Sequence, residues 1–295
     1  MARTDAMTLI EFQSRFTSEE NCETYLFQKR WLKGFCCSKC KNDKYYYIKT
    51  RKLYECRQCG HQDSLTSGTL MHKSKLPLLT WFWAIFLVVH DKRGRSALSL
   101  AQLLKLNYRT AWRLLHKIRH AMCERDASYK LSGFIEMDDA YFGSPQQGTD
   151  GRGTKKAKVS IALATDENGN PRFVRMNVID KMSTVEMQRV AENCIDKGSA
   201  ITSDGLSAYK KLSEIGYKHT SKNFYQVDDD FLKWLHIIIS NAKAFIIGTY
   251  HGLGHKYLQA YLDEYCYRFN RRFFPSELFG RLLNACLSIG HFRLA

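Results

Sequence analysis

The sequence lacks an apolar run long enough to cross a membrane. Its most apolar stretch, Leu76 to Val89, is 14 residues long and contains Pro77, whereas a membrane-spanning helix needs roughly 18–20 residues. No apolar segment of the signal-peptide type follows Met1. We therefore expect no membrane association and a cytoplasmic location, where free thiols are normal.

Acidic residues are also scarce. The 295 residues contain 29 Asp plus Glu against 45 Lys plus Arg, which gives a net charge of +16. The excess is uneven, because residues 1–130 hold 24 basic and 11 acidic side chains (+13) and residues 131–295 hold 21 and 18 (+3). A charge of this size points to a polyanionic partner, so we expect the first part of the chain to meet phosphate.

Composition and periodicity divide the chain into segments. Residues 1–34 have helical spacing of apolar side chains, residues 35–66 are rich in cysteine, and residues 76–126 have the pattern of several helices. From residue 131 onward the pattern changes to short β-rich runs at 134–142, 159–164, 172–179 and 200–203, then helices near 231–247, 255–272 and 276–288. This order predicts a multidomain chain that ends in an α/β or α+β domain over residues 131–295.

Two Cys-x-x-Cys pairs, Cys37 with Cys40 and Cys56 with Cys59, are separated by 15 residues. Each pair can place two thiolates on one turn, and two such turns complete a tetrahedral four-sulfur site. Residues 45–48 and 53–54 supply a short hairpin between them. We predict a zinc ribbon that holds one structural zinc and needs it to fold. The arrangement of the ten cysteines excludes a secreted disulfide scaffold. The alternatives to a zinc ribbon are a set of free cysteines or two redox Cys-x-x-Cys motifs.

Residues 99–122 have the pattern of two helices joined by a turn at 106–107, with Ser99 as the expected cap of the first. In the second, apolar residues share one face, and basic residues recur on the other: Arg109, Arg113, Lys117 and His120. This pattern is typical of a helix-turn-helix whose second helix enters the major groove. A solvated amphipathic helix is the alternative. Beside the ribbon and the +13 charge, we favour DNA contact by Arg109, Arg113 and Lys117.

Carboxylates occur in two of the predicted strands. Asp138 and Asp139 lie in the apolar run 134–142, where Asp is unfavourable unless it binds metal or takes part in catalysis. Asp204 ends the run 200–203, although a turn-forming role is open for it. Two carboxylates that converge on divalent metal would suit phosphoryl transfer. Alternation puts Asp138 and Asp139 on opposite faces, and the sequence does not choose between them.

The helix expected at 231–247 offers no carboxylate on its polar stripe, which consists of Lys233, His236, Ser240 and Lys243. At about 100° per residue, Lys243 lies within roughly 20° of His236, and Asn241 is rotated away by roughly 140°. On the next helix Glu264, Arg268 and Arg271 share one face, where a salt-bridge ladder is the simple interpretation. His236 is the candidate third ligand, and Glu264 is its rival.

Several motifs together resemble one family: residues 27–35 and 54–60 around the cysteines, then 136–143, 203–205, 248–251 and 261–272. In these the chain is similar to bacterial insertion-sequence transposases, which have an N-terminal zinc ribbon and a C-terminal DDE-type domain of RNase H-like fold. The resemblance covers nearly all of the chain. It implies that Asp138 and Asp204 are the catalytic aspartates and that Lys243 is the matched lysine. Many relatives carry Glu where this chain has His236, and Glu264, Arg268 and Arg271 match an accessory signature.

The resemblance implies a DNA transposase that binds the ends of an insertion sequence and catalyses metal-dependent cleavage and strand transfer. Asp138, Asp204 and His236 would hold Mg²⁺ or Mn²⁺, with Mn²⁺ favoured because it accepts nitrogen ligands more readily. The implied partners are double-stranded DNA, of the element ends and the target, and further copies of the chain in a homodimer or larger synaptic assembly at the bacterial nucleoid. The alternatives are a DNA-binding regulator without activity and a nuclease that cuts without joining.

Overall fold

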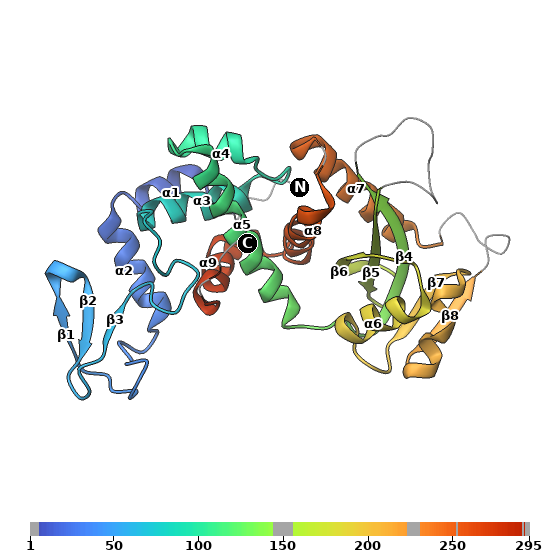
Figure 1. Cartoon of the computed structure of the whole chain (residues 1–295), viewed down its shortest axis with the longest axis horizontal. Coiled ribbons are helices and arrows are strands. Elements are labelled where there is room, and N and C mark those ends of the chain that lie inside the picture. Colours follow the sequence, from blue (N-terminus) through green and yellow to red (C-terminus); the bar gives the residue numbers. More distant parts are fainter. Residues whose placement is uncertain (1–5, 144–155, 223–230, 252, 291, 293–295) are drawn as a thin grey trace. The chain divides into compact units, whose positions relative to one another are not determined.

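The computed structural model describes residues 6–143, 156–222, 231–251, 253–290 and 292. The chain forms two compact units (Figure 1). The first, here called the helical unit, comprises Met1–Asp91, Ala97–Ala121 and Phe274–Ala295; the second, the sheet unit, comprises Lys92–Ser96 and Met122–Phe273. Within the described ranges, no helix has the length and hydropathy that a membrane crossing requires.

Aromatic side chains build the core of the helical unit. Its helices are α1 (Leu9–Arg15), α2 (Glu19–Arg30), α3 (Leu78–His90), α4 (Ala97–Leu104), α9 (Leu278–Ser288) and most of α5 (Tyr108–Ala127). The buried ring of Phe279 in α9 lies 5.5 Å from the rings of Phe12 and Phe16 and 5.6 Å from that of Phe82. The sequence places residues 276–288 in the C-terminal domain, but in the structure α9 packs with α1 and α3, because its apolar face completes this aromatic core.

The cysteine-rich segment folds as a three-stranded antiparallel sheet, β1 (Tyr45–Ile48), β2 (Leu53–Cys56) and β3 (Gln62–Ser64), in that order. The sequence predicts the first two strands as a hairpin and does not predict the third. The rings of Trp31 and Phe35 lie 5.1 and 6.1 Å from that of Tyr54 in β2. Aromatic packing therefore joins the ribbon to the end of α2.

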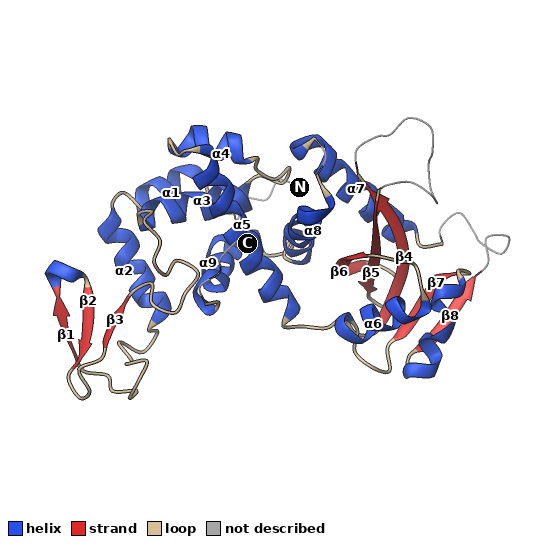
Figure 2. Ribbon diagram, viewed as in Figure 1, coloured by secondary structure: helices blue, strands red, loops and turns tan. Residues whose placement is uncertain are grey.

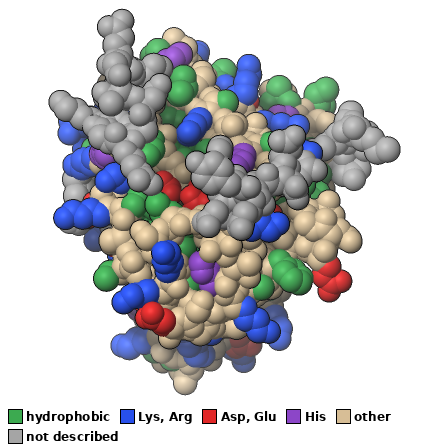
Figure 3. All heavy atoms as spheres, turned by 90° about the vertical axis from the view of Figure 1, so that its right-hand side faces the viewer, with side chains coloured by type: hydrophobic (Ala, Val, Ile, Leu, Met, Phe, Trp, Pro, Cys, Tyr) green, Lys and Arg blue, Asp and Glu red, His purple; other side chains and the backbone are tan. Residues whose placement is uncertain are grey.

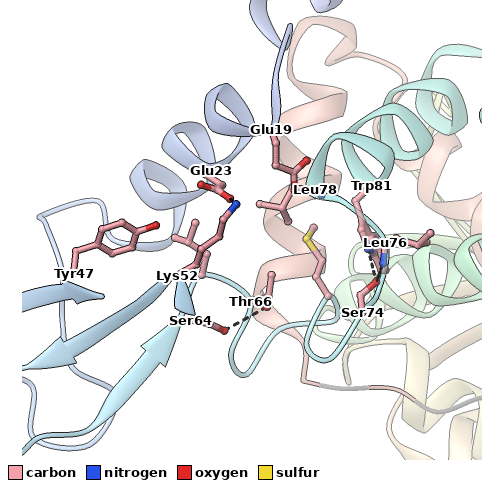
Figure 4. A pocket seen from close by; sticks show the side chains of 12 residues that line it. Glu19, Glu23, Tyr47, Lys52, Ser64, Thr66, Ser74, Leu76, Leu78 and Trp81 are labelled. Carbon is pink, nitrogen blue, oxygen red and sulfur yellow. Dashed lines mark hydrogen bonds and ion pairs between the residues drawn. The ribbon is translucent and has the colours of Figure 1, made fainter. Parts of the chain in front are cut away.

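A small pocket separates the ribbon hairpin from α2 and α3 (Figure 4). The Nζ atom of Lys52 lies 2.6 Å from Oε1 of Glu23. The carboxylate of Glu19 accepts hydrogen bonds from the backbone N–H groups of Leu78 (2.7 Å) and Leu79 (2.9 Å). These donors at the start of α3 have no partner inside the helix, so Glu19 caps it from another element. We interpret this pocket as a structural joint.

The sheet unit contains five strands, β4 (Phe134–Phe142), β5 (Ala157–Thr165), β6 (Pro171–Ile179), β7 (Ala200–Asp204) and β8 (Lys218–Lys222). Their order is β6-β5-β4-β7-β8; β4, β5 and β6 pair antiparallel, and β7 runs parallel to both β4 and β8 (Figure 2). The predicted class, a zinc ribbon and helices followed by an α/β domain, is confirmed. The sequence does not predict β8, because its residues are polar and it lies at an edge.

The two faces of this sheet carry different helices. On one face Ile135 and Met137 pack with α6 (Thr184–Cys194) and the 3-10 helix η2 (Ser207–Ile215). On the other, Ala140 and Phe142 pack with α7 (Lys233–Tyr250) and α8 (His255–Asn270). Because side chains alternate along β4, Asp138 shares the face with α7 and Asp139 the face with α6. The fold thus settles which aspartate meets the helix of His236.

Side-chain amides of α8 cover the edge strand β6. Gln259 accepts a hydrogen bond from Val178 N (2.7 Å) and donates to Met176 O (2.9 Å), and Asn270 accepts from Val174 N (2.8 Å). These contacts occupy backbone groups that an uncovered edge would offer to another strand. They also fix α8 along the sheet.

Candidate functional site

Asp138 and Asp204 lie side by side on neighbouring parallel strands. The register of β4 and β7 pairs Met137 with Ser203, so the next residues of both strands are the two aspartates. Ser203 is fully buried on the face of α6, and alternation therefore directs both carboxylates to the face of α7. The structure brings these two predicted residues together at the end of β7.

His236 of α7 reaches the first of these carboxylates. Its Nε2 atom lies 3.3 Å from Oδ2 of Asp138, and the side chains of the two residues are 58% and 17% exposed. Burial raises the pKa of the Asp138 carboxyl; the backbone N–H of Asp139 opposes this rise, Asp204 adds to it, and His236 lowers the pKa. A metal-binding carboxylate must be ionised.

The contact between Asp138 and His236 has the geometry of two ligands of one ion. Neighbouring ligands of an octahedral ion, each about 2.1 Å from it, lie about 3 Å apart. In the described part of the chain, only the four ribbon cysteines form a group of three or more potential ligand atoms within 4.8 Å of one another. The fit of Asp138, Asp204 and His236 to a divalent ion therefore rests on this contact and on the strand register.

The other residues of the predicted polar stripe lie along the same edge of α7. Lys233, His236 and Ser240 are exposed, and Lys243 is half-buried. The ammonium of Lys243 lies 5.8 Å from the ring centroid of Phe142, the last residue of β4. Since Phe142 and Asp138 share one face of that strand, the lysine lies on the side of the sheet where the carboxylates point.

One carboxylate at this site was missed by the analysis of the sequence. Glu136 precedes Asp138 by two residues and shares its face of β4. Its Oε2 atom is buried and has no hydrogen-bond partner among the residues that the structure describes. Burial raises the pKa of Glu136, and the charge of His236 opposes that rise. The signal was present, because a period of two places both carboxylates on one side of an apolar strand.

The residues of the accessory signature are paired; Glu264 and Arg271 are buried, and Arg268 is half-buried. Glu264 is 1% exposed, and its Oε1 atom accepts from Arg268 Nε (3.1 Å) and Nη2 (2.9 Å). The Nη1 atom of Arg271 lies 2.7 Å from Oδ1 of Asp126, at the end of α5. Glu264, the alternative to His236 as third metal ligand, is therefore already paired with an arginine.

The ribbon cysteines have the geometry of a zinc site. The sulfur atoms of Cys37 and Cys59 lie 3.6 Å apart, and those of Cys40 and Cys56 lie 3.4 Å apart. A tetrahedral zinc with Zn–S bonds of about 2.3 Å spaces its ligands by about 3.8 Å. With four thiolates the coordination is complete, so the site suits a structural ion.

Only the first part of the basic face predicted on α5 is exposed in the structure. Arg109 and Arg113 are exposed. Lys117 is half-buried with its Nζ atom 5.8 Å from the ring centroid of Trp81, and burial lowers its pKa. The ring of His120 stacks on Phe292 at 3.9 Å. The lower part of the stripe thus packs within the helical unit, because aromatic side chains cover it.

The cap predicted for the first helix of this pair also differs. Ser99 lies inside α4, which begins at Ala97. The second helix begins as expected, and Asn107 caps it by accepting a hydrogen bond from Arg109 N at 2.9 Å. This cap holds the start of α5, where both exposed arginines lie.

Comparisons with known proteins identify both parts of the chain. Residues 17–62 match the transposase zinc-ribbon domain, and residues 130–270 match the ISXO2-like transposase domain. A protein of Halobacterium salinarum, described as an uncharacterized protein in transposable element ISH50, is 24% identical over 218 residues, which cover 68% of this chain and 71% of that protein.

Two solved structures are also similar. The match to the catalytic core domain of BIV integrase covers 46% of this chain and 81% of the integrase chain, at 13% identity and a TM-score of 0.31. The match to the Mos1 transposase, in a paired-end complex with the left transposon end, covers 71% of this chain and 80% of the Mos1 chain, at 9% identity and a TM-score of 0.31.

Proposed function

We propose a function from the premise that this chain is an insertion-sequence transposase with an N-terminal zinc ribbon: it binds the DNA ends of its element, cuts them, and joins them to target DNA. The observation that carries the proposal is the contact of Asp138 with His236, together with the strand register that places Asp204 beside Asp138 on the same face of the sheet. Carboxylates on neighbouring strands with a nearby imidazole form a donor set that divalent metal ions accept.

In this proposal Asp138, Asp204 and His236 hold the metal ions, Mg²⁺ or Mn²⁺. When bound, such ions activate an attacking oxygen and stabilise the leaving oxygen of a phosphodiester. Lys243 offsets charge on the scissile phosphate or positions the strand, because its ammonium lies on the same side of β4 as the carboxylates. The half-burial of Asp138 and Asp204 limits the water around the reacting groups.

DNA reaches the chain through positive surface on both units. In the helical unit the ribbon and the exposed Arg109 and Arg113 would hold the element ends. On the face of the molecule in Figure 3, Lys and Arg side chains are widely spread and Asp or Glu side chains show at few points. Transposition needs two ends together, so we include a homodimer or larger synaptic assembly in the proposal.

The test is a strand-cleavage and strand-transfer assay on labelled element ends with Mg²⁺ or Mn²⁺. We expect Asp138→Ala and Asp204→Ala to abolish cleavage and to leave binding of the ends intact. His236→Ala should damage cleavage severely. Asn241→Ala, an exposed position on the same helix, is the matched control and should cleave nearly normally. Normal cleavage by His236→Ala together with loss in Glu264→Gln would transfer the ligand role to Glu264.

The same assay separates the two alternative functions. The absence of a carboxylate at position 236 favours a regulator that binds DNA without cutting it; such a protein would retain the ends in a gel-shift experiment and show no cleavage in either metal. A nuclease that only cuts would release products and never join them to a second duplex. Joined products in the wild type would exclude both.

A further inference from the structure

Glu136 is half-buried on the strand that carries Asp138, and one oxygen of its carboxylate is buried without a hydrogen-bond partner in the described part of the chain. Its Oε2 atom is shielded from solvent, and none of the described residues donates a hydrogen bond to it. A buried polar atom without a partner costs free energy, so such an atom in a folded chain calls for an explanation such as an ion or a catalytic role. No part of the function proposed above uses this side chain.

The position of Glu136 directs it towards the same site as Asp138. The two residues are two apart on β4, which places their Cα atoms about 6.6 Å apart on one face of the sheet. The strand partner of Glu136 on β7 is Thr202, two residues before Asp204. Glu136 therefore shares with Asp138 the face of β4 that packs with α7.

The donor set assigned so far is short of negative charge. Asp138 and Asp204 bring two formal charges, and the neutral imidazole of His236 brings none. The other carboxylates considered near this site are engaged or turned away: Glu264 is held by Arg268, and Asp139 lies on the face of α6. Besides Asp138 and Asp204, Glu136 shares the face of α7, and its buried Oε2 atom has no hydrogen-bond partner among the described residues.

We propose that Glu136 is the third carboxylate of the metal centre, so that strand β4 supplies the charge that α7 lacks. This inference rests on the proposed function, since it assigns a ligand to the metal ions of that reaction. With Glu136 the site has three formal negative charges and mainly oxygen donors, which are the ligands that Mg²⁺ prefers. The chain should therefore be active with Mg²⁺ as well as Mn²⁺, although the histidine alone favours Mn²⁺.

The test measures Mn²⁺ binding by the full, zinc-loaded chain, by isothermal titration and by the Mn²⁺-induced rise in melting temperature. Glu136→Gln keeps the size of the side chain and removes its charge. We expect it to weaken Mn²⁺ binding by about tenfold or more and to lose most of the thermal shift. Asp139→Asn, the neighbouring carboxylate on the opposite face, is the matched control and should bind Mn²⁺ within about twofold of the wild type.

Melting without added metal separates a ligand from a merely structural residue. If Glu136 is a ligand, Glu136→Gln should melt no lower than the wild type in buffer without Mg²⁺ or Mn²⁺, because a half-buried charge has been removed. A lower melting point with an unchanged Mn²⁺ shift would overturn the proposal. Glu136→Asp keeps the charge but shortens the reach by one methylene, and weakened Mn²⁺ binding in this variant provides the same answer if Glu136→Gln does not fold.

Asp138→Asn distinguishes failure of this inference from failure of the proposed function. If Asp138→Asn loses Mn²⁺ and Glu136→Gln binds it like the wild type, the metal centre stands and Glu136 has no part in it. If Asp138→Asn also binds Mn²⁺ normally, the metal centre itself is wrongly placed, and both proposals fail.

Discussion

At the scale of single residues, α8 carries a half-buried aspartate, Asp263, whose carboxyl has a raised pKa. Asp263 accepts a hydrogen bond from Gln259 Nε2 at 2.9 Å. Burial raises the pKa of this carboxyl to about 6, although hydrogen bonds from Gln259 and Cys123 and the charge of Arg175 oppose the rise. Its charged form is therefore less stable in the folded chain than in the unfolded one.

The raised pKa of Asp263 predicts how stability depends on pH. The folded chain retains the proton between about pH 4 and pH 6, so the contribution of Asp263 to stability is full below about pH 4 and is lost as pH rises through about 6. Asp263→Asn removes the ionisation and should stabilise the chain at pH 8 by an amount on the order of 3 kcal/mol. Thermal unfolding of variant and wild type should show this difference at pH 8 and a smaller one near pH 4.5; equal differences at both values would contradict it.

The sequence predicts the position of a residue within its own strand or helix, but it does not predict which distant segments pack over that residue. The sequence pattern predicts a carboxylate in the run 134–142 and another at Asp204, the choice of Asp138 over Asp139 came from the family resemblance, and the polar stripe that includes His236 came from helical periodicity. The burial of Lys117 under Trp81 and the unsatisfied oxygen of Glu136 depend on distant segments that pack over them, and periodicity carries no information about those.

At the scale of elements, the first turns of α5 and its middle have different roles. Arg109 and Arg113 are exposed, whereas the stem of Lys117 packs on Trp81. If both arginines contact phosphate, the double variant Arg109→Ala/Arg113→Ala should make the log–log salt dependence of DNA binding shallower by about 2 × 0.9, or roughly 1.8 units. Binding titrations at several salt concentrations measure this slope.

Lys117→Ala is the matched control on the same helix. It should lower the melting temperature, because it removes packing on Trp81, and it should leave the salt slope unchanged. A slope that falls with Lys117→Ala and stays constant in the double arginine variant would assign the DNA contacts to the other part of α5.

Elements with a strong internal pattern could be predicted closely, and those defined by their neighbours could not. The run 134–142 alternates and coincides with β4. By contrast, β8 is polar along its length and pairs only because β7 offers it an edge. The amides of Gln259 and Asn270, which cover β6, had no signal in the sequence, because only the fold places them opposite backbone groups.

At the scale of the whole molecule, the helical unit combines the two ends of the sequence. Residues 1–121 supply most of its helices, and residues 274–295 supply α9. The sequence could not reveal this, because α9 follows the helices of the sheet unit without a break in composition. Helix α9 belongs to the helical unit because its buried face completes the aromatic core of that unit.

Phe279→Ala should therefore destabilise the helical unit, although the residue lies near the other end of the chain. Removing a buried Phe ring costs about 3–5 kcal/mol. Four of the five tryptophans lie in this unit, at positions 31, 81, 83 and 112, so tryptophan fluorescence during thermal unfolding follows it selectively. Phe274→Ala removes a ring that is 41% exposed and is the control, with an expected change within about 0.5 kcal/mol.

The return of α9 sets an order of events during protein synthesis. A ribosome makes residues 122–273 before it makes α9, so the core around Phe12, Phe16 and Phe82 stays open while the whole sheet unit emerges and folds. A product of premature termination in the sheet unit would retain that exposed aromatic surface and be a target for proteases. An incomplete chain would then not persist as a DNA-binding competitor, and only ribosomes that pass α9 would release a protein able to occupy an element end.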